Sequence, residues 1–305
     1  MTSLSLYSPS GVIAKAAPLK LAVRRLGQLG FDVSVDPAAR LKWQRFAGPD
    51  DERLAALHRT AEAAPDIAMA TRGGYGLTRL LDRIDWPLLA RSIERGTRWV
   101  GHSDNTVLQL ALLAHLGRDA GRSWSGPLAC ADFGRAEAAG GVDEVTRDCF
   151  VEAMGGELEA VGFRTESGFD GLHARGHLWG GNLAIVNSLL GTRHWPRADV
   201  TKGGILFLED VNEHPYRVER SLLQLQQAGV LDSQKAILLG HFTGWKKSPL
   251  DRGYSLKSML AQLRATTSTP ILTGLPFGHV PTKVSLPQGA RVQLLVQGRD
   301  VLIGW

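Results

Sequence analysis

Trp99-Val100-Gly101-His102-Ser103-Asp104-Asn105 leads from a short apolar run into the segment 106–116, which is apolar nearly all round. This order predicts a strand that turns sharply into a buried helix. Gly101 would leave room for the tight turn, and Ser103 would stand at the helix N-terminus, where free backbone N–H groups favour developing negative charge. Asn105 takes the place of the second glycine in Gly-x-Ser-x-Gly, and serines also cap helices, so the turn predicts either a nucleophile or a cap.

A second informative stretch ends at Glu209. Glycine or apolar residues fill positions 204–208 without alternation, which predicts a strand buried on both faces. Its C-terminal end would deliver the carboxylate to the edge where open α/β sheets bind ligands. Further on, the Pro/Gly turn Leu275-Pro276-Phe277-Gly278-His279 presents one histidine. Serine, glutamate and histidine can act as nucleophile, orienting acid and base, and such triads occur in more than one chain order.

Other side chains compete for the same roles. Asp210 and Glu213 closely follow the glutamate, and His241 ends an apolar run and rivals the histidine of the Pro/Gly turn. His102 adjoins the serine, but neighbours in a sharp turn project apart, which makes it a poor base. His-Glu-x-x-His is absent, and the two histidines spaced four apart lie in the strand-like segment 172–178. The sequence therefore predicts no metal site.

A glycine-rich turn, Arg72-Gly73-Gly74-Tyr75-Gly76, follows the strand-like segment 66–70. It matches neither Gly-x-Gly-x-x-Gly nor a phosphate loop, so it predicts no nucleotide site. The turn is either a tight bend that requires positive φ or an oxyanion hole. In the second case a glycine amide would face the serine turn, with the N–H of Asp104 as second donor. Arg72 is either structural or a clamp for a terminal carboxylate.

Composition excludes several classes of protein. The 305 residues are 44% hydrophobic and 21% charged, which is ordinary for a globular protein, and no apolar run is long enough for a membrane span. The N-terminus lacks the basic region of a signal peptide, and two cysteines suit a reducing compartment, so we expect a cytoplasmic protein. The net charge of +5 comes without a nucleic-acid motif and favours an anionic small ligand.

The order of elements predicts an α/β fold in two parts. In residues 1–156 strand-like and helix-like segments alternate, which is typical of a parallel sheet covered by helices. A Gly- and polar-rich linker is expected at 157–171, followed by a smaller, strand-rich domain at 172–305. The expected strands are 4–7, 32–35, 66–70, 98–100, 172–178, 205–209, 236–240, 284–286, 290–296 and 301–303. The expected helices are 18–29, 51–64, 106–116, 142–154 and 217–228, with a further short helix after residue 76.

Strings spread over almost the whole chain resemble the LD-carboxypeptidases, also called muramoyltetrapeptide carboxypeptidases, a serine peptidase family of bacterial cell-wall recycling. The matching strings are Leu6-Tyr7-Ser8-Pro9-Ser10-Gly11, Arg45-Phe46-Ala47-Gly48, Arg72-Gly73-Gly74-Tyr75-Gly76, Gly101-His102-Ser103-Asp104, Ser125-Gly126-Pro127, Trp179-Gly180-Gly181-Asn182-Leu183, Leu208-Glu209-Asp210-Val211-Asn212-Glu213-His214-Pro215 and Phe277-Gly278-His279.

The resemblance implies a Rossmann-like N-terminal domain joined to a barrel-like C-terminal one. It implies that Ser103, Glu209 and His279 are catalytic and favours Gly74 as the oxyanion donor beside Asp104. The implied reaction releases D-alanine from murein tetrapeptides, anionic muropeptide substrates, without metal or organic cofactor. A homodimer is also implied, and no nucleic-acid or membrane partner is expected.

Two other functions stay open. A hydrolase of acyl- or peptidyl-nucleotide conjugates, as in microcin self-immunity, would keep the triad and add an aromatic platform for the base. Trp179, which we also expect to bind substrate, and Trp245 could provide it. The remaining alternative is a non-catalytic muropeptide-binding protein, against which an intact Ser, Glu and His set argues.

Overall fold

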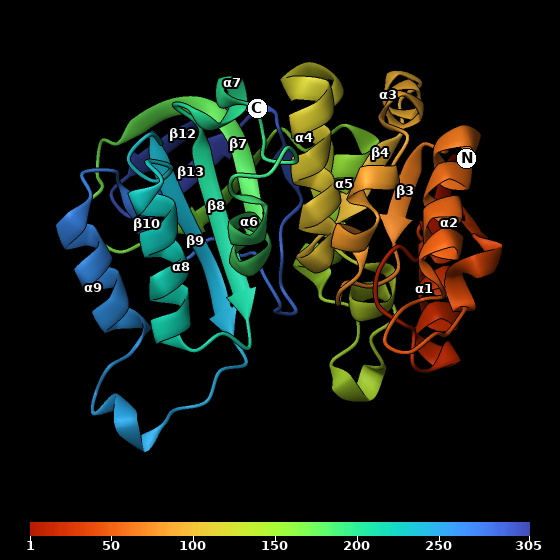
Figure 1. Cartoon of the computed structure of the whole chain (residues 1–305), viewed down its shortest axis with the longest axis horizontal. Coiled ribbons are helices and arrows are strands. Elements are labelled where there is room, and N and C mark those ends of the chain that lie inside the picture. Colours follow the sequence, from red (N-terminus) through yellow and green to blue (C-terminus); the bar gives the residue numbers. More distant parts are fainter.

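The computed structural model describes residues 1–305, which form two β-sheets covered by helices (Figure 1). The first sheet has the order β11-β5-β4-β3-β1-β2, and all neighbouring strands are parallel except β11 and β5. The expected parallel sheet is thus confirmed. Its strands are β1 (Thr2–Tyr7), β2 (Phe31–Val35), β3 (Ile67–Ala70), β4 (Arg98–Gly101), β5 (Ser123–Ser125) and β11 (Leu286–Gln288).

Helices cover both faces of this sheet because its central strands are apolar on both sides. Consecutive residues of β1, such as Leu6 and Tyr7, point to opposite faces and belong to different core clusters. One face packs against α1 (Ala16–Gln28) and α5 (Glu144–Gly155), and the other against α2 (Asp50–Ala63), α3 (Trp86–Glu94) and α4 (Thr106–Ala120). This sandwich is the usual solution for a parallel sheet, which must bury both faces.

The second sheet has the order β10-β9-β8-β7-β12-β13-β6. Its first four strands are parallel, and its last three pair antiparallel. The sheet curls, so that the N–H of Thr273 beside one edge donates to Thr165 Oγ1 beside the other at 3.3 Å, but no ladder closes it. Its strands are β6 (Ala160–Arg164), β7 (His173–Asn182), β8 (Ile205–Val211), β9 (Ala236–Thr243), β10 (Ile271–Thr273), β12 (Arg291–Gln297) and β13 (Asp300–Gly304).

Four helices accompany the second sheet: α6 (Leu183–Leu189), α7 (Ala198–Thr201), α8 (Pro215–Gln227) and α9 (Leu256–Thr266). Leu206 and Leu208 of β8 share a core cluster with residues of α6, α8 and α9, whereas Phe207 points into the concave side lined by β12 and β13. The barrel-like character expected for this part therefore corresponds to a strongly curved but open sheet.

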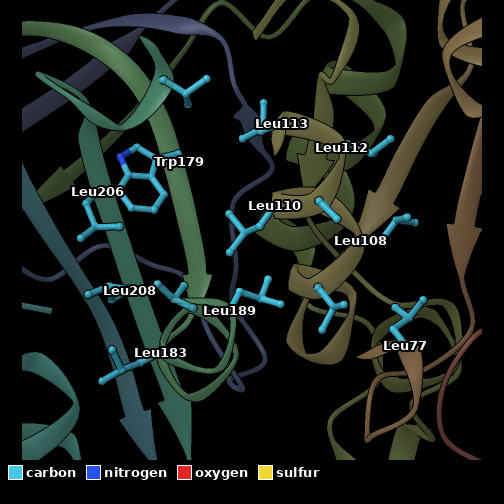
Figure 2. Close-up of a cluster of buried hydrophobic side chains, with 14 of the residues drawn as sticks. Leu77, Leu108, Leu110, Leu112, Leu113, Trp179, Leu183, Leu189, Leu206 and Leu208 are labelled. Atoms are coloured by element: carbon cyan, nitrogen blue, oxygen red, sulfur yellow. The ribbon is translucent and has the colours of Figure 1, made fainter. Parts of the chain in front are cut away.

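Helix α4 lies between the two sheets (Figure 1). Every residue from Thr106 to Leu113 is buried, which explains why this segment is apolar nearly all round. Figure 2 shows leucines of α4 facing Trp179 and Leu206 of the second sheet on one side and Leu77 on the other. A single hydrophobic core therefore continues from one sheet to the other through this helix.

The division between the two sheets does not follow the order of the chain strictly. Strand β11, from the C-terminal part, pairs with β5 in the first sheet. Strand β6 lies within the segment 157–171, expected as a linker, and pairs with β13. The division at 157–171 stays a prediction. No helix is both long and apolar enough to cross a membrane.

Candidate active site

The loop after β4 lifts Ser103 out of the sheet. This residue has φ +62°, in the left-handed region that a side chain rarely occupies, and the short 3₁₀ turn Ser103–Asn105 leads directly into α4. Gly101 leaves the space that the turn needs, because a Cβ there would lie 2.6 Å from Asn105 Nδ2. Strained backbone of this kind is typical of a serine held at a strand-to-helix turn. The predicted sharp turn is present.

Three side chains far apart in the sequence form one hydrogen-bonded chain. Nε2 of His279 lies 2.9 Å from Oγ of Ser103, 176 residues away. Nδ1 of the same ring lies 2.8 Å from Oε2 of Glu209. With Nδ1 protonated, the ring donates to the carboxylate and offers the Nε2 lone pair to the serine hydroxyl. The arrangement can therefore remove the serine proton and hold the resulting imidazolium beside a carboxylate.

Glu209 is fully buried, at the place where β8 stops pairing regularly. The pairing of β8 with β9 shifts between Leu208 and Asp210, a local bulge. Besides His279, Asn182 contacts the carboxylate, with Nδ2 3.2 Å from Oε1. Asn182 is directly opposite Glu209 in the β7–β8 register. A buried carboxylate needs such partners, and the amide fixes which oxygen faces the imidazole.

The environment of His279 favours its charged form. Burial of the ring acts to lower the pKa of His279, but the hydrogen bond and the negative charge of Glu209 outweigh it and raise this pKa above the ordinary value. The close approach depends on Gly278, which has φ +134° and whose Cβ would lie 3.2 Å from Glu209 Oε2. The Pro/Gly turn is thus required for contact between the imidazole and the carboxylate.

The glycine-rich turn after β3 lies against the serine. A Cβ at Gly73 would be 2.7 Å from both Cβ and Oγ of Ser103. The N–H groups of Gly74 and Asp104 donate to no other group of the protein, so both are available to a ligand oxygen. The two strands that precede these amides, β3 and β4, are parallel neighbours, and their ends share one sheet edge. The expected oxyanion donors therefore lie on the two turns that meet at the serine.

The Asp104 carboxylate helps to hold this glycine-rich turn. Its Oδ2 accepts from Ser10 Oγ at 2.6 Å and from the Leu77 N–H at 3.0 Å. Burial raises the pKa of Asp104, although these two hydrogen bonds oppose the rise. The side chain therefore connects the loops after β1 and β3 to the serine turn, while its backbone N–H stays free.

None of the competing acids and bases forms a hydrogen bond with Ser103 Oγ or with the His279 ring. Burial raises the pKa of Asp210 to about 6, and its oxygens accept from Asn182 Nδ2 and from backbone N–H groups, not from an imidazole. Glu213 pairs with a neighbouring arginine. The ring of His241 makes no hydrogen bond within the chain. Burial holds the pKa of His102 well below its ordinary range, and its Nδ1 contacts Gly126 O at 2.9 Å.

One expectation about substrate binding is corrected. Trp179 is fully buried, donates from Nε1 to Gln234 Oε1 at 3.0 Å, and packs in the core between the sheets (Figure 2), so it has no face to offer a substrate. Trp245, on the loop after β9, is only half-buried. Arg72 is exposed, and one of its nitrogens donates to Val12 O at 2.8 Å, so its role as a carboxylate clamp stays a prediction.

The sequence reasoning missed a role for Asn182. Asn182 belongs to the matching string Trp179-Gly180-Gly181-Asn182-Leu183, but nothing in that string indicates contact with Glu209. Its backbone N–H donates to Thr106 Oγ1 at 3.2 Å, at the start of α4. No group of three or more His, Cys, Asp or Glu side chains is arranged to hold a metal ion.

Known protein families and solved structures match this chain over most of its length. Residues 4–120 match the model of the LD-carboxypeptidase N-terminal domain, and residues 175–294 match that of the C-terminal domain. A probable murein peptide carboxypeptidase of Bacillus subtilis is 31% identical over 299 residues, 96% of this chain and 90% of the relative. The crystal structure of muramoyltetrapeptide carboxypeptidase from Oxalobacter formigenes has a TM-score of 0.87 at 38% identity, covering 99% of this chain and 98% of the other.

A more distant likeness concerns the fold alone. Microcin C7 self-immunity protein MccF of Escherichia coli is 22% identical over 273 residues, 78% of this chain and 74% of the relative. Its structure in complex with aspartyl sulfamoyl adenosine has a TM-score of 0.84 at 19% identity, covering 100% of this chain and 96% of the other. The matches to both domain models, together with a relative above 30% identity over nearly the whole length, establish that this chain belongs to the LD-carboxypeptidase family.

Proposed function

We propose that this protein is a serine-type LD-carboxypeptidase that hydrolyses the amide bond between an L-configured centre and a terminal D-alanine in murein tetrapeptides. The observation that carries the proposal is the hydrogen-bonded chain from Ser103 through His279 to Glu209. Family membership and the names of the relatives supply the substrate class. We place the reaction in cytoplasmic peptidoglycan recycling and expect a homodimer, on the resemblance alone.

In the first step Ser103 Oγ attacks the carbonyl carbon while its proton passes to Nε2 of His279. Glu209 holds the ring in the required tautomer and stabilises the imidazolium that forms. The oxygen of the tetrahedral intermediate would accept from the N–H groups of Gly74 and Asp104. These donors stand free before the reaction, so no reorganisation is needed when the charge develops.

Collapse of this intermediate breaks the C–N bond. The amine of D-alanine leaves with the proton from His279, and an ester remains on Ser103. Water then attacks the ester carbon, giving one proton back to the imidazole, and the serine oxygen leaves with that proton. The products are a tripeptide carboxylate and D-alanine, and the enzyme returns to its starting state.

Arg72 is the side chain we propose for the substrate carboxylate. It immediately precedes the glycine-rich turn, and its guanidinium keeps nitrogens that donate to no protein group. A terminal carboxylate one residue beyond the scissile bond would lie within reach of the Arg72 guanidinium. A second D-alanine would place the terminal carboxylate beyond it. Because the guanidinium is exposed, solvent moderates the discrimination that a buried clamp would give.

The test is incubation with defined tetrapeptide, pentapeptide and all-L peptides, followed by mass spectrometry. We expect loss of one D-alanine from the tetrapeptide and little change in the other two. Ser103→Ala is the matched inactive control. A chain that leaves the tetrapeptide intact, while a fluorophosphonate probe still labels Ser103, would refute the substrate and keep the serine mechanism.

The second candidate is hydrolysis of an acyl- or peptidyl-nucleotide conjugate, favoured by the fold likeness to MccF and by the half-buried ring of Trp245, which lies 5.5 Å from the ring of His214. An aminoacyl sulfamoyl adenosine separates the two functions. Its cleavage at a higher kcat/KM than the tetrapeptide would select this alternative. Failure of the fluorophosphonate probe to label wild-type Ser103 would instead favour a muropeptide-binding protein without catalysis.

A further inference from the structure

The loop that carries His279 is held mainly by groups from the N-terminal half of the chain. Two residues at the start of α5 hold it by hydrogen bonds. Thr146 Oγ1 donates to Pro281 O and accepts from the Lys283 N–H, both at 2.8 Å. Asp143, the N-cap of α5, accepts from Thr282 Oγ1 at 2.7 Å. These bonds fix the loop downstream of the histidine.

One contact of this loop is ionic and buried. The Lys283 ammonium pairs with Asp132, and the two side chains are only 2% and 8% exposed. Lys283 Nζ also donates to Val280 O at 2.7 Å, the carbonyl next to His279 in the chain. Asp132 lies on a single turn of π-helix, Ala129–Phe133, and its second oxygen accepts from the Leu128 N–H at 2.7 Å. The pair therefore joins the histidine loop to the segment that follows β5.

The same segment contacts the other side of the site. Gly126, between β5 and the π-turn, accepts the hydrogen bond from His102 Nδ1, and the ring of His102 lies 5.3 Å from that of His279, edge to face. The chain from 126 to 132 thus fixes the residue beside the nucleophile and, through the ion pair, the loop of the base. Hydrophobic packing could hold this loop without burying two charges, which cost free energy to desolvate.

We propose that Lys283 and Asp132 are positioning residues that act as an electrostatic clamp, seating the His279 loop on the N-terminal half and balancing the charge that the imidazole experiences. The proposal rests on the proposed serine mechanism, because it assigns the clamp to the base of that mechanism. It does not depend on which peptide is the substrate.

Removing either charge of the clamp should shift the pKa of His279, and the two removals should shift it in opposite directions. An intact pair is close to neutral, whereas loss of one partner leaves a single charge near the imidazole. Lys283 acts to lower the pKa of His279, so removing the ammonium should raise this pKa. Removing the Asp132 carboxylate that pairs with the ammonium should lower the pKa of His279, because the positive charge is then unopposed. The other charged or titratable groups around the loop, unchanged in these variants, are Glu209 and Asp210 from β8, His102 beside the serine, and Asp143 before α5.

The experiment measures the rate of Ser103 labelling by a fluorophosphonate probe against pH, together with kcat/KM for tetrapeptide. We expect K283M to move the acid limb of both profiles up by about half a unit to one unit and D132N to move it down by a similar amount. The double variant K283M/D132N should return the limb to the wild-type pH but keep a kcat reduced about 10- to 100-fold, because the loop is no longer clamped.

Thr282→Val is the matched control, since it removes a neutral anchor of the same loop. It should lower kcat without moving the acid limb. Shifts of the acid limb in opposite directions in the two single variants support the clamp. If the single variants do not fold, a reduced kcat with an unmoved acid limb in the double variant supports it. Identical or absent shifts in folded single variants, or wild-type kcat in the double variant, overturn it. Labelling without tetrapeptide cleavage in the wild type would refute only the proposed substrate.

Discussion

Replacement of Gly73 by alanine tests whether the glycine-rich turn sets the position of the nucleophile. The new Cβ would lie 2.7 Å from Cβ and Oγ of Ser103, about 0.7 Å short of the 3.4 Å at which ordinary contact begins. Ser103 has little room to retreat, because its φ of +62° is already strained and α4 is buried behind it. One of the two turns must therefore move by several tenths of an ångström.

This displacement bears directly on the 2.9 Å contact between Ser103 Oγ and His279 Nε2. A misplacement approaching 1 Å costs on the order of 10²-fold in rate, so we expect kcat to fall about 30- to 100-fold. Overpacking of this kind costs about 1–3 kcal/mol in the free energy of unfolding, which leaves the protein folded. KM should change little if, as we propose, Arg72 and not the serine turn binds the substrate carboxylate.

The assay couples D-alanine release to D-amino acid oxidase, with thermal unfolding measured in parallel. Gly27→Ala is the control, since Gly27 lies in α1 and a Cβ there meets nothing within 4 Å. That variant should keep wild-type kcat and gain up to about 1 kcal/mol in the free energy of unfolding. A Gly73→Ala enzyme with kcat within threefold of the wild type would show that the turn does not set the serine position.

Three further predictions concern the proposed catalytic groups. Ser103→Ala should lower kcat on the order of 10⁶-fold with unchanged thermal stability, and retention of a tenth of the rate would exclude a serine nucleophile. Only neutral His279 accepts the serine proton, and Glu209 raises the pKa of this ring, so kcat/KM should be lost as pH falls through a value above about 6.5. Glu209→Gln should shift this acid limb of the pH profile to lower pH, and an unmoved limb would contradict the assignment of Glu209 as the partner of His279. Arg72→Ala should reduce kcat/KM for tetrapeptide about 10- to 100-fold, and Arg72→Lys less, as judged by D-alanine release. Equal rates in Arg72→Ala and wild type would exclude Arg72 as the residue that binds the substrate carboxylate.

Local patterns predicted the buried framework well. Unbroken apolar runs predicted β8 and β9, and the all-round apolar segment predicted α4, because burial on every side leaves a direct mark on composition. The short strands β5 and β10, of three residues each, were not predicted. Their pairing depends on neighbours distant in the chain, which no local pattern reports. A short helix without bounds was expected after the glycine-rich turn, but not the start of α3 at Trp86, although Asp85 caps it and accepts from the Leu88 N–H at 2.9 Å.

The residues of the candidate site were also only partly predictable from local sequence patterns. Position at a strand end or turn identified Ser103 and Glu209 as candidates, but the choice of His279 over His241 came from the family resemblance. Only the fold shows that the rings of these two histidines differ in contacts, one bonded to both serine and glutamate and the other to neither. Trp179 shows the opposite case: an aromatic residue in a matching string was expected to bind substrate, yet tertiary packing buries it completely.

The position of α4 explains how the two halves can share one site. The helix begins at Thr106, directly after the 3₁₀ turn that starts at Ser103, so a shift of its axis moves the nucleophile. At that same end Thr106 Oγ1 accepts from the Asn182 N–H, and a Cβ at Gly181 would lie 2.6 Å from Thr106 Oγ1, so β7 packs tightly against the start of the helix. Asn182 in turn contacts Glu209. The packing that joins the two sheets therefore also sets the distance from Ser103 to Glu209. The imidazole of His279 lies between these two residues and contacts both.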